Sequence, residues 1–336
     1  MTTIFIFVHN CGVSRSPEPP RPRRPLHTLP ATVLALAGLA AGLTACGGGA
    51  DAPPGKTEVV ASIYPVAWLA EQVGGDDVFV RTLTEPGTEP HDLELTARKA
   101  ADITKADFAV YIGGVQPAVD DAVRRHAADK SLDAVSVVKT LPAQTGEEDH
   151  GHEGEDHGHE DEEADHDPHI WLDPARMATV ATALGDRLAD ADPAHASGYR
   201  KRAGSTAAAL AELDRTYRDG LKTCERREII TAHGAFGYLA DRYELKQIPI
   251  AGVDPGDEPS PRRLADLARR VSATGATTVF TETLVSPKVA ESLARAAGVR
   301  TAVLDPIEGI EDGSSDDYLT IMQRNLRTLR PALECT

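Results

Sequence analysis

The chain has 336 residues, 41% of them hydrophobic and 4% aromatic, which suits two domains of medium size that can each bury a core. Its formal net charge of −17 argues against nucleic acid as a partner, because a phosphate backbone repels an acidic surface. Much of this charge is local: residues 147–167 contain twelve Asp and Glu, five His and no Lys or Arg.

The N-terminal segment has the features of an export signal. Arginines between positions 21 and 24 precede an apolar run at 29–43, which is shorter than the about 20 residues that a membrane span needs. We therefore predict a signal peptide over residues 1–45. The stretch "LTAC", which ends at Cys46, resembles the lipobox of bacterial lipoproteins, in which the cysteine is lipidated. This predicts an extracytoplasmic protein anchored to the cell membrane at Cys46, with a flexible tether over 46–56; a plain secretory signal with an incidental cysteine is the alternative.

After the tether, β-branched apolar runs alternate with helical patterns, which predicts parallel strands covered by helices. The expected strands are residues 58–63, 78–83, 108–113 and 133–138, then 227–232, 246–251, 277–282 and 300–305. Between the two sets, residues 174–222 have a helical pattern, with Asp173 as its N-cap before Pro174. The predicted fold class is α/β, with one lobe at 57–173, a connecting helical region at 174–222 and a second lobe at 223–336.

The four cysteines have separate expected fates. Cys11 lies in the predicted signal peptide and Cys46 is the predicted lipidation site, which leaves Cys224 and Cys335. Two cysteines in an exported protein favour a disulfide, and the chain has no CxxC spacing that would indicate a thiolate metal site.

Four short segments carry side chains that can bind a metal. They are "EPGTEPHDLEL", "DPHIWLDP", "ITAHGAFGYL" and "AVLDPIEG", and they contain His91, His169, His233 and Asp305. His233 directly follows a predicted strand and Asp305 ends one, and open α/β sheets bind ligands at the carboxyl ends of strands. Taken singly, each residue also has a structural interpretation, such as a hydrogen-bonded histidine or an aspartate that caps a turn. Glu282 and Glu308 are further candidates, as supporting groups or alternative ligands.

The motifs follow a known order. The chain contains "PGTEPHDLELTARKAADITKADFAVYIGG", "DPHIWLDPARM", "TAHGAFGYLADRY", "FTETLVSPKVAESLA" and "LDPIEG", and this series resembles the zinc and manganese solute-binding lipoproteins of ABC transporters. The resemblance covers residues 58–333. It implies two α/β lobes joined by a rigid helix, with one transition-metal ion in the cleft between the lobes. The implied ligands are His91, His169, His233 and Asp305, and Glu308 stays open as the fourth ligand because family members vary there between Asp and Glu.

The expected ion is Zn²⁺. Three imidazoles and one carboxylate match a four-coordinate zinc set, whereas Mn²⁺ favours more oxygen ligands. The manganese branch of the family typically replaces the third histidine with a carboxylate, and this chain has His233 there. Insertions rich in His and acid before the second ligand are a trait of the zinc branch. The resemblance thus makes residues 147–167 an accessory loop that is flexible and collects zinc weakly. Its histidines are His150, His152, His157, His159 and His166.

We expect a high-affinity zinc-binding protein that acts outside the cytoplasm as a monomer and delivers Zn²⁺ to the membrane subunit of an ABC permease. We do not expect an enzyme, because an exported zinc hydrolase needs a general base such as the Glu of HExxH, which the chain lacks. A third hypothesis is a surface adhesin or metal buffer that acts through the histidine-rich loop.

Overall fold

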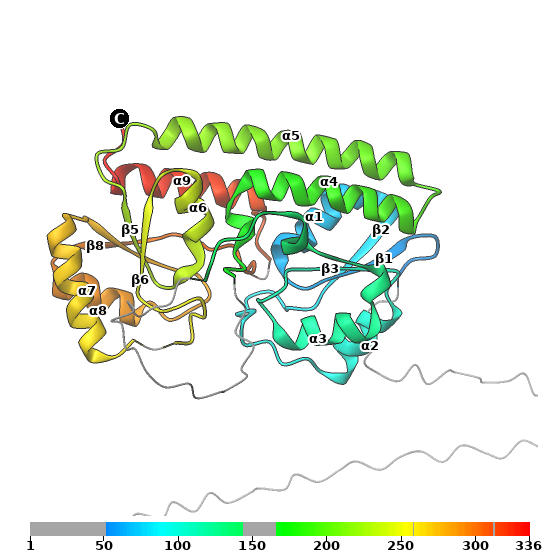
Figure 1. Ribbon diagram of the computed structural model, residues 1–336, viewed down its shortest axis with the longest axis horizontal. Helices are drawn as coiled ribbons and strands as arrows, with labels where there is room; N and C mark the ends of the chain where they lie inside the picture. The colour runs from blue at the N-terminus through cyan, green and yellow to red at the C-terminus, as the bar shows by residue number, and fades with distance from the viewer. Residues whose placement is uncertain (1–51, 144–165, 258, 312) are drawn as a thin grey trace, which may run out of the picture. The chain divides into compact units, whose positions relative to one another are not determined.

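The computed structural model describes residues 52–143, 166–257, 259–311 and 313–336. These residues belong to one compact unit that runs from Ala50 to Thr336. They form two parallel sheets of four strands each, and helices pack against both faces of each sheet (Figure 1). The predicted architecture of two α/β lobes is confirmed. Within the described ranges, none of the helices is both long and apolar enough to cross a membrane.

The first lobe is built on the sheet β2-β1-β3-β4. Its strands are β1 (Thr57–Ala61), β2 (Val78–Thr82), β3 (Phe108–Tyr111) and β4 (Ser131–Asp133). Its helices are α1 (Tyr64–Gly74) on one face and α2 (Ala97–Lys105) and α3 (Pro117–His126) on the other. Val59 and Val60 point to opposite faces of β1, and each is buried in a different hydrophobic cluster. The strands are therefore apolar on both sides, as a parallel sheet covered by helices requires.

One predicted strand is largely wrong. Of the predicted range 133–138, only Asp133 belongs to a strand, and Ala134–Val137 form a short 3₁₀ helix instead. The Asp133 carboxylate accepts the backbone N–H of Val135 at 3.1 Å and that of Gly113 at 3.0 Å. This side chain caps the helical turn, and a local bond of this kind competes with strand pairing.

The second lobe repeats the strand order of the first, as β6-β5-β7-β8. Its strands are β5 (Glu228–Thr231), β6 (Lys246–Pro249), β7 (Thr278–Thr281) and β8 (Arg300–Val303). Its helices are α6 (Gly237–Arg242) and α9 (Tyr318–Ala332) on one face, and α7 (Pro261–Thr274) and α8 (Lys288–Ala297) on the other.

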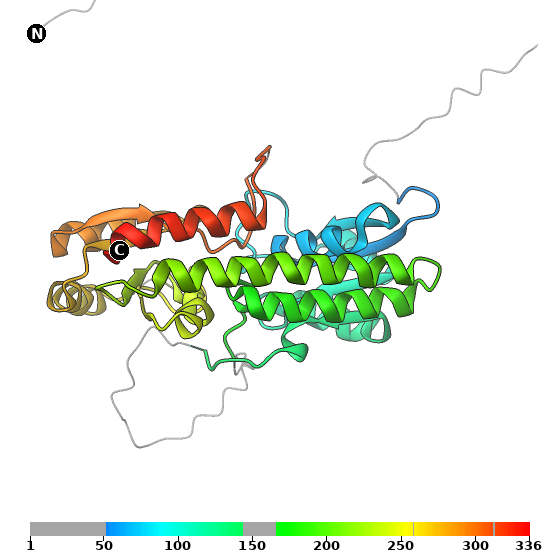
Figure 2. The ribbon, with the colours of Figure 1, turned by 90° about the horizontal axis from the view of Figure 1, so that it is seen from above.

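Two long helices connect the lobes. They are α4 (Pro174–Ala191) and α5 (Ala196–Leu221), and they lie side by side in both ribbon views (Figures 1 and 2). The Asp173 side chain accepts the backbone N–H of Ala175 at 2.8 Å, so the predicted N-cap is confirmed. The 26 residues of α5 extend roughly 39 Å. This helix packs against α1 of the first lobe and α9 of the second, and so braces both.

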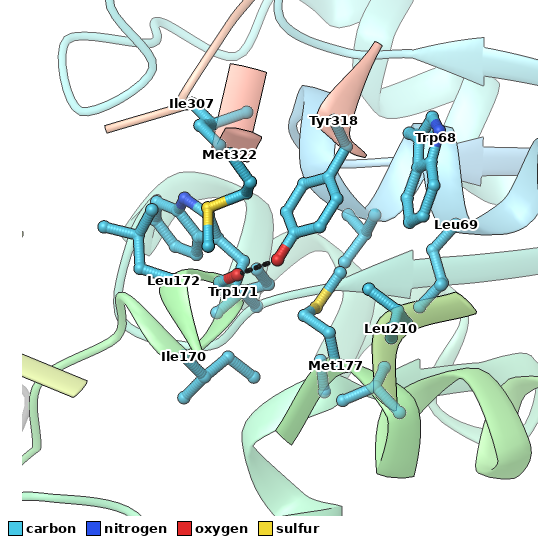
Figure 3. Close-up of a cluster of buried hydrophobic side chains, with 14 of the residues drawn as sticks. Trp68, Leu69, Ile170, Trp171, Leu172, Met177, Leu210, Ile307, Tyr318 and Met322 are labelled. Carbon is cyan, nitrogen blue, oxygen red and sulfur yellow. Dashed lines mark hydrogen bonds between the residues drawn. The ribbon is translucent and has the colours of Figure 1, made fainter. Parts of the chain in front are cut away.

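A shared apolar core lies where the lobes meet (Figure 3). The ring of Trp68 in α1 stacks on that of Tyr318 in α9, with centroids 4.7 Å apart. The Tyr318 hydroxyl donates to the carbonyl of Trp171, and the Trp171 indole N–H donates to the carbonyl of Pro306 at 2.6 Å. The segments around Trp171 and Pro306 are thereby fixed to both lobes.

The predicted disulfide between Cys224 and Cys335 is confirmed. It joins the segment just after α5 to the segment just after α9, 111 positions apart. The predicted lipidation site Cys46 and the loop histidines His150, His152, His157 and His159 lie outside the described residues.

Candidate metal site

Four side chains converge where the lobes meet. His91, His169, His233 and Glu308 each offer one ligand atom, and these atoms all lie within 4.8 Å of one another. The four residues follow β2, precede α4, follow β5 and follow β8 respectively, so both lobes contribute. The His169 and His233 side chains are fully buried, and those of Glu308 and His91 are 1% and 6% exposed.

His91 lies on the loop between β2 and α2. The side-chain amide of Gln116 donates to the carbonyl of Pro90 at 3.0 Å and to the hydroxyl of Thr84 at 2.8 Å. The backbone N–H of His91 donates to the Glu89 carboxylate at 3.1 Å. Burial first, and the negative charge of Glu308 second, raise the pKa of Glu89 to about 8. These contacts hold the backbone of the loop and leave the His91 ring directed at the cluster.

His169 is oriented by a residue two positions before it. The Asp167 carboxylate accepts the backbone N–H of His169 at 2.9 Å and lies 2.7 Å from its ring Nδ1. The hydroxyl of Tyr238 donates to the Asp167 carbonyl at 2.6 Å, which anchors this segment on the second lobe. A carboxylate on Nδ1 selects the tautomer whose Nε2 is free to bind a metal.

Asp167 was not expected at the site, because the predicted acidic loop at 147–167 ends with it. Asp167 is 1% exposed and contacts a candidate ligand, so it is not a solvated loop residue. The DPH spacing, in which a carboxylate lies two residues before a histidine, is the sequence signal that could have distinguished Asp167 from the other acidic residues of the segment. His166, expected to be an accessory ligand, has its Nε2 3.2 Å from the carbonyl of Gly113.

His233 lies two residues after β5, between two carboxylates. Both oxygens of Glu282 lie 2.8 Å from its Nδ1, and Glu308 Oε1 lies 3.0 Å from its Nε2. The backbone N–H of His233 donates to Glu282 at 3.2 Å. Glu282 was expected to be either a supporting group or an alternative ligand. Its contacts suit a supporting group, because Glu282 contacts Nδ1 of His233, whereas Nε2 of the same ring faces Glu308.

Glu308 is the point on which the three imidazoles converge. Its Oε1 lies 3.0 Å from His233 Nε2, 3.4 Å from His169 Nε2 and 3.6 Å from His91 Nε2. The other oxygen, Oε2, is buried and has no hydrogen-bond partner among the described residues, and the same holds for the Nε2 atoms of His91 and His169. Buried polar atoms left without partners are costly unless something else binds them.

The structure does not bring Asp305, the expected fourth ligand, into this group. Its Oδ1 accepts the backbone N–H of Ile307 at 2.8 Å, and its Oδ2 lies 3.9 Å from Arg324. The physical reason is the turn after β8, where Ile307 has a positive φ of 59° and the chain directs Glu308 to the cluster.

The protonation states follow from these contacts. Burial by itself would lower the pKa of His233, but the Glu282 and Glu308 carboxylates raise it well above its usual value. For His169, burial is likewise outweighed by Asp167, and the pKa is raised. Burial would raise the pKa of Glu308, yet the charge of His233 and the nearby imidazoles hold that pKa well below its usual value. These shifts favour protonated His169 and His233 and an ionised Glu308 in the metal-free cluster, and a divalent cation would replace that positive charge.

Three of the six donor separations are close to those around one tetrahedral ion, and all six are within 4.8 Å. Donor atoms about 2.1 Å from a zinc ion at tetrahedral angles are about 3.4 Å from one another. The three separations between Glu308 Oε1 and the imidazole nitrogens, from 3.0 to 3.6 Å, lie on both sides of that value.

The profile of a family described as "Zinc-uptake complex component A periplasmic" matches residues 59–332. The chain belongs to this family. It is 37% identical over 294 residues to the zinc-binding protein AdcA of Streptococcus pyogenes serotype M3, which covers 82% of this chain and 56% of that protein. The chain thus spans little more than half the length of this relative. It is 35% identical over 299 residues to the high-affinity zinc uptake system protein ZnuA of Bacillus subtilis, covering 87% of this chain and 93% of that protein.

Solved structures agree with the fold. The crystal structure of the Zn(II)-bound ZnuA-like domain of Streptococcus pneumoniae AdcA has 30% identity and a TM-score of 0.69, and covers 83% of this chain and all of that one.

Proposed function

We propose that this protein captures Zn²⁺ outside the cytoplasm and delivers it to the membrane subunit of an ABC permease. The observation that carries the proposal is the convergence of three imidazole Nε2 atoms on one carboxylate oxygen, at 3.0, 3.4 and 3.6 Å, in a buried site. The ligands are His91, His169, His233 and Glu308. The relatives named as zinc-binding and zinc-uptake proteins support the same cargo.

The donor set favours zinc over manganese. Three nitrogens and one oxygen make a borderline-soft tetrahedral set, which is the arrangement of many zinc sites, whereas manganese prefers more oxygen ligands. The two nearby carboxylates that contact ring Nδ1 atoms, Asp167 and Glu282, support the histidines and so do not enlarge the oxygen set.

Binding and release suit this site better than catalysis. A catalytic zinc keeps an open position for water beside three protein ligands, whereas here the protein supplies four donors. Glu308, which could otherwise act as a general base, is the carboxylate at the centre of the group.

The test is metal analysis of protein purified without a histidine tag, followed by competitive titration. We expect one tightly bound Zn²⁺ per chain in the wild type, and a large loss of affinity in Glu308→Ala and His233→Ala. His195→Ala is the matched control, because His195 lies outside the group and contacts Asp192 at 2.7 Å. Wild-type affinity in both site variants would refute the proposed ligands.

We also propose that the mature protein begins at a lipidated Cys46 and that the acidic segment collects zinc for the tight site. Cys46→Ser protein should be released from membranes; continued anchoring would refute the lipid attachment. Deletion of residues 147–165, which spares Asp167, should lower the total zinc stoichiometry and leave one tight site. Loss of the tight site in this deletion would favour the alternative in which the loop itself is the functional element.

A further inference from the structure

The segment between β8 and the cluster contains an unusual backbone conformation. Ile307 has φ of 59°, in the left-handed region, although it is β-branched and fully buried. A β-branched residue is rarely found there, because its side chain crowds the backbone. Such strain persists only where the surroundings over-determine it, and it is concentrated at functional sites. Ile307 directly precedes Glu308, the carboxylate on which the three histidines converge.

Contacts on both sides hold this turn in place. The Asp305 carboxylate accepts the Ile307 N–H at 2.8 Å, a bond that closes the turn on itself. The side-chain amide of Asn325 in α9 binds the Asp305 backbone twice, accepting its N–H at 3.0 Å and donating to its carbonyl at 2.7 Å. Trp171 donates to the carbonyl of Pro306 at 2.6 Å. The side chain of Ile307 is buried in the shared core with Met322 (Figure 3).

The conformation of Ile307 decides where Glu308 lies. With an ordinary negative φ at Ile307, the chain would leave the turn in another direction, and Glu308 would not reach three nitrogens at 3.0–3.6 Å. Among the described residues, the bond from Asp305 is the one side-chain hydrogen bond to the Ile307 backbone. Asp305 is therefore placed to stabilise the conformation that aims the fourth ligand.

We propose that Asp305 is a positioning residue: it holds Ile307 in the left-handed conformation and thereby presents Glu308 to the cation. This inference rests on the proposed function. It assigns to Asp305 an action through the backbone, three residues from the ligand, in place of a direct bond to the ion.

A double-mutant cycle tests the inference. The variants are Asp305→Ala, Asp305→Asn, Glu308→Ala and the double variant Asp305→Ala/Glu308→Ala, with zinc affinity measured by competition. Asp305→Ala should weaken binding about 10- to 100-fold, the usual effect of losing a group that supports a ligand. Asp305→Asn keeps an oxygen that can accept the Ile307 N–H, so it should bind nearly as the wild type. In the Glu308→Ala background, removing Asp305 should change affinity no further.

Asp316→Ala is the matched control for charge, because Asp316 also contacts Arg324 but makes no bond to Ile307. It should leave affinity unchanged. A metal-free readout is hydrogen exchange at the Ile307 amide, which should be slow in the wild type and Asp305→Asn and faster in Asp305→Ala.

Two results would overturn the inference. An equal loss of affinity on removing Asp305 with and without Glu308 would mean that Asp305 acts on the ion or on another ligand. A lower melting temperature in Asp305→Ala with unchanged affinity would mean that its role is only structural. Unchanged affinity in both His233→Ala and Glu308→Ala is a different failure, which would refute the proposed ligand set and leave Asp305 nothing to position.

Discussion

The sheets β2-β1-β3-β4 and β6-β5-β7-β8 share one strand order, yet His91, which follows β2, and His233, which follows β5, are held in different ways. In the second lobe, His233 comes two residues after its strand, and carboxylates contact both of its ring nitrogens. In the first lobe, His91 comes nine residues after its strand, and its Nε2 lies 3.6 Å from Glu308 without a hydrogen-bond partner among the described residues. The second lobe thus carries a preformed half-site of His233 and Glu308, to which His91 is added from a longer loop.

The two sheets share a strand order, but they do not support their histidines in the same way. The short connection after β5 restricts the position of the His233 side chain. The longer loop after β2 depends on anchoring hydrogen bonds, such as the one that the Gln116 amide donates to the Pro90 carbonyl. Preorganised groups lose less freedom on binding, so we expect the second lobe to dominate the stability of the empty site.

The largest expected effect is that of His233→Ala. Zinc affinity should fall by more than about 100-fold, since losing a ligand should exceed the 10- to 100-fold typical of a supporting group. The variant also leaves Glu282 and Glu308 buried without their positive partner, which should destabilise the metal-free protein by about 3–5 kcal/mol. His91→Ala should weaken zinc binding without a comparable loss of stability. Competitive titration and urea denaturation measure the two quantities, and equal destabilisation by both substitutions would contradict the preformed half-site.

The next effect separates the two supporting carboxylates. Glu282→Gln and Asp167→Asn each remove the charge that faces a ring Nδ1, and each should lower zinc affinity about 10- to 100-fold. Glu282→Gln should have the larger effect, because both oxygens of Glu282 lie 2.8 Å from the His233 ring. Asp241→Asn, a half-exposed carboxylate near Arg176, serves as the control. A larger loss of zinc affinity in Asp167→Asn than in Glu282→Gln would mean that His169 depends more on its carboxylate than His233 does.

The fold, and three of the four residues proposed here as ligands, could be predicted from the sequence. The alternation of apolar runs and helical patterns reports burial directly, and His91, His169 and His233 each lie in a short, recognisable motif. The choice between Asp305 and Glu308 could not be made, because it depends on a positive φ at Ile307 that no side-chain pattern reveals.

The supporting role of Asp167 and the 3₁₀ helix at Ala134–Val137 were not predicted from the sequence, for related reasons. A carboxylate that follows eleven others in a polar run has the same composition as its neighbours, and in the sequence only its position two residues before His169 distinguishes it. The cap that ends β4 depends on one aspartate oxygen in a segment whose β-branched residues favour a strand. In both cases a single local hydrogen bond outweighs composition.

Zinc affinity and the stability of the metal-free protein should depend on pH with opposite signs. Zinc must displace protons from His233 and His169, whose pKa values are raised, so affinity should fall with decreasing pH and begin to fall above the usual histidine pKa of about 6.5. In the metal-free protein, the raised values contribute stability that is fully present below pH of about 6.5 and lost as pH rises through the folded-state pKa. Zinc titrations and denaturation curves recorded across the range from about pH 5 to about pH 9 would show how affinity and metal-free stability each change with pH. Zinc affinity that stays constant across this range would contradict proton displacement.

The smallest effect on the site is expected from the disulfide, which belongs to the second lobe alone. The pair Cys224→Ser/Cys335→Ser should lower the free energy of unfolding by about 2–4 kcal/mol, somewhat less than chain-entropy estimates of about 4–5 kcal/mol for a closed loop of this length. Zinc affinity should stay within about twofold of the wild type, because apolar packing and the bonds from Asn325 and Trp171 hold the Glu308 turn independently of the C-terminus. Comparison of the variant with reduced wild-type protein controls for the serine hydroxyls. A large loss of affinity would show that the half-site in the second lobe depends on the covalent link, and its contrast with the first lobe would then come from the disulfide and not from the short connection after β5.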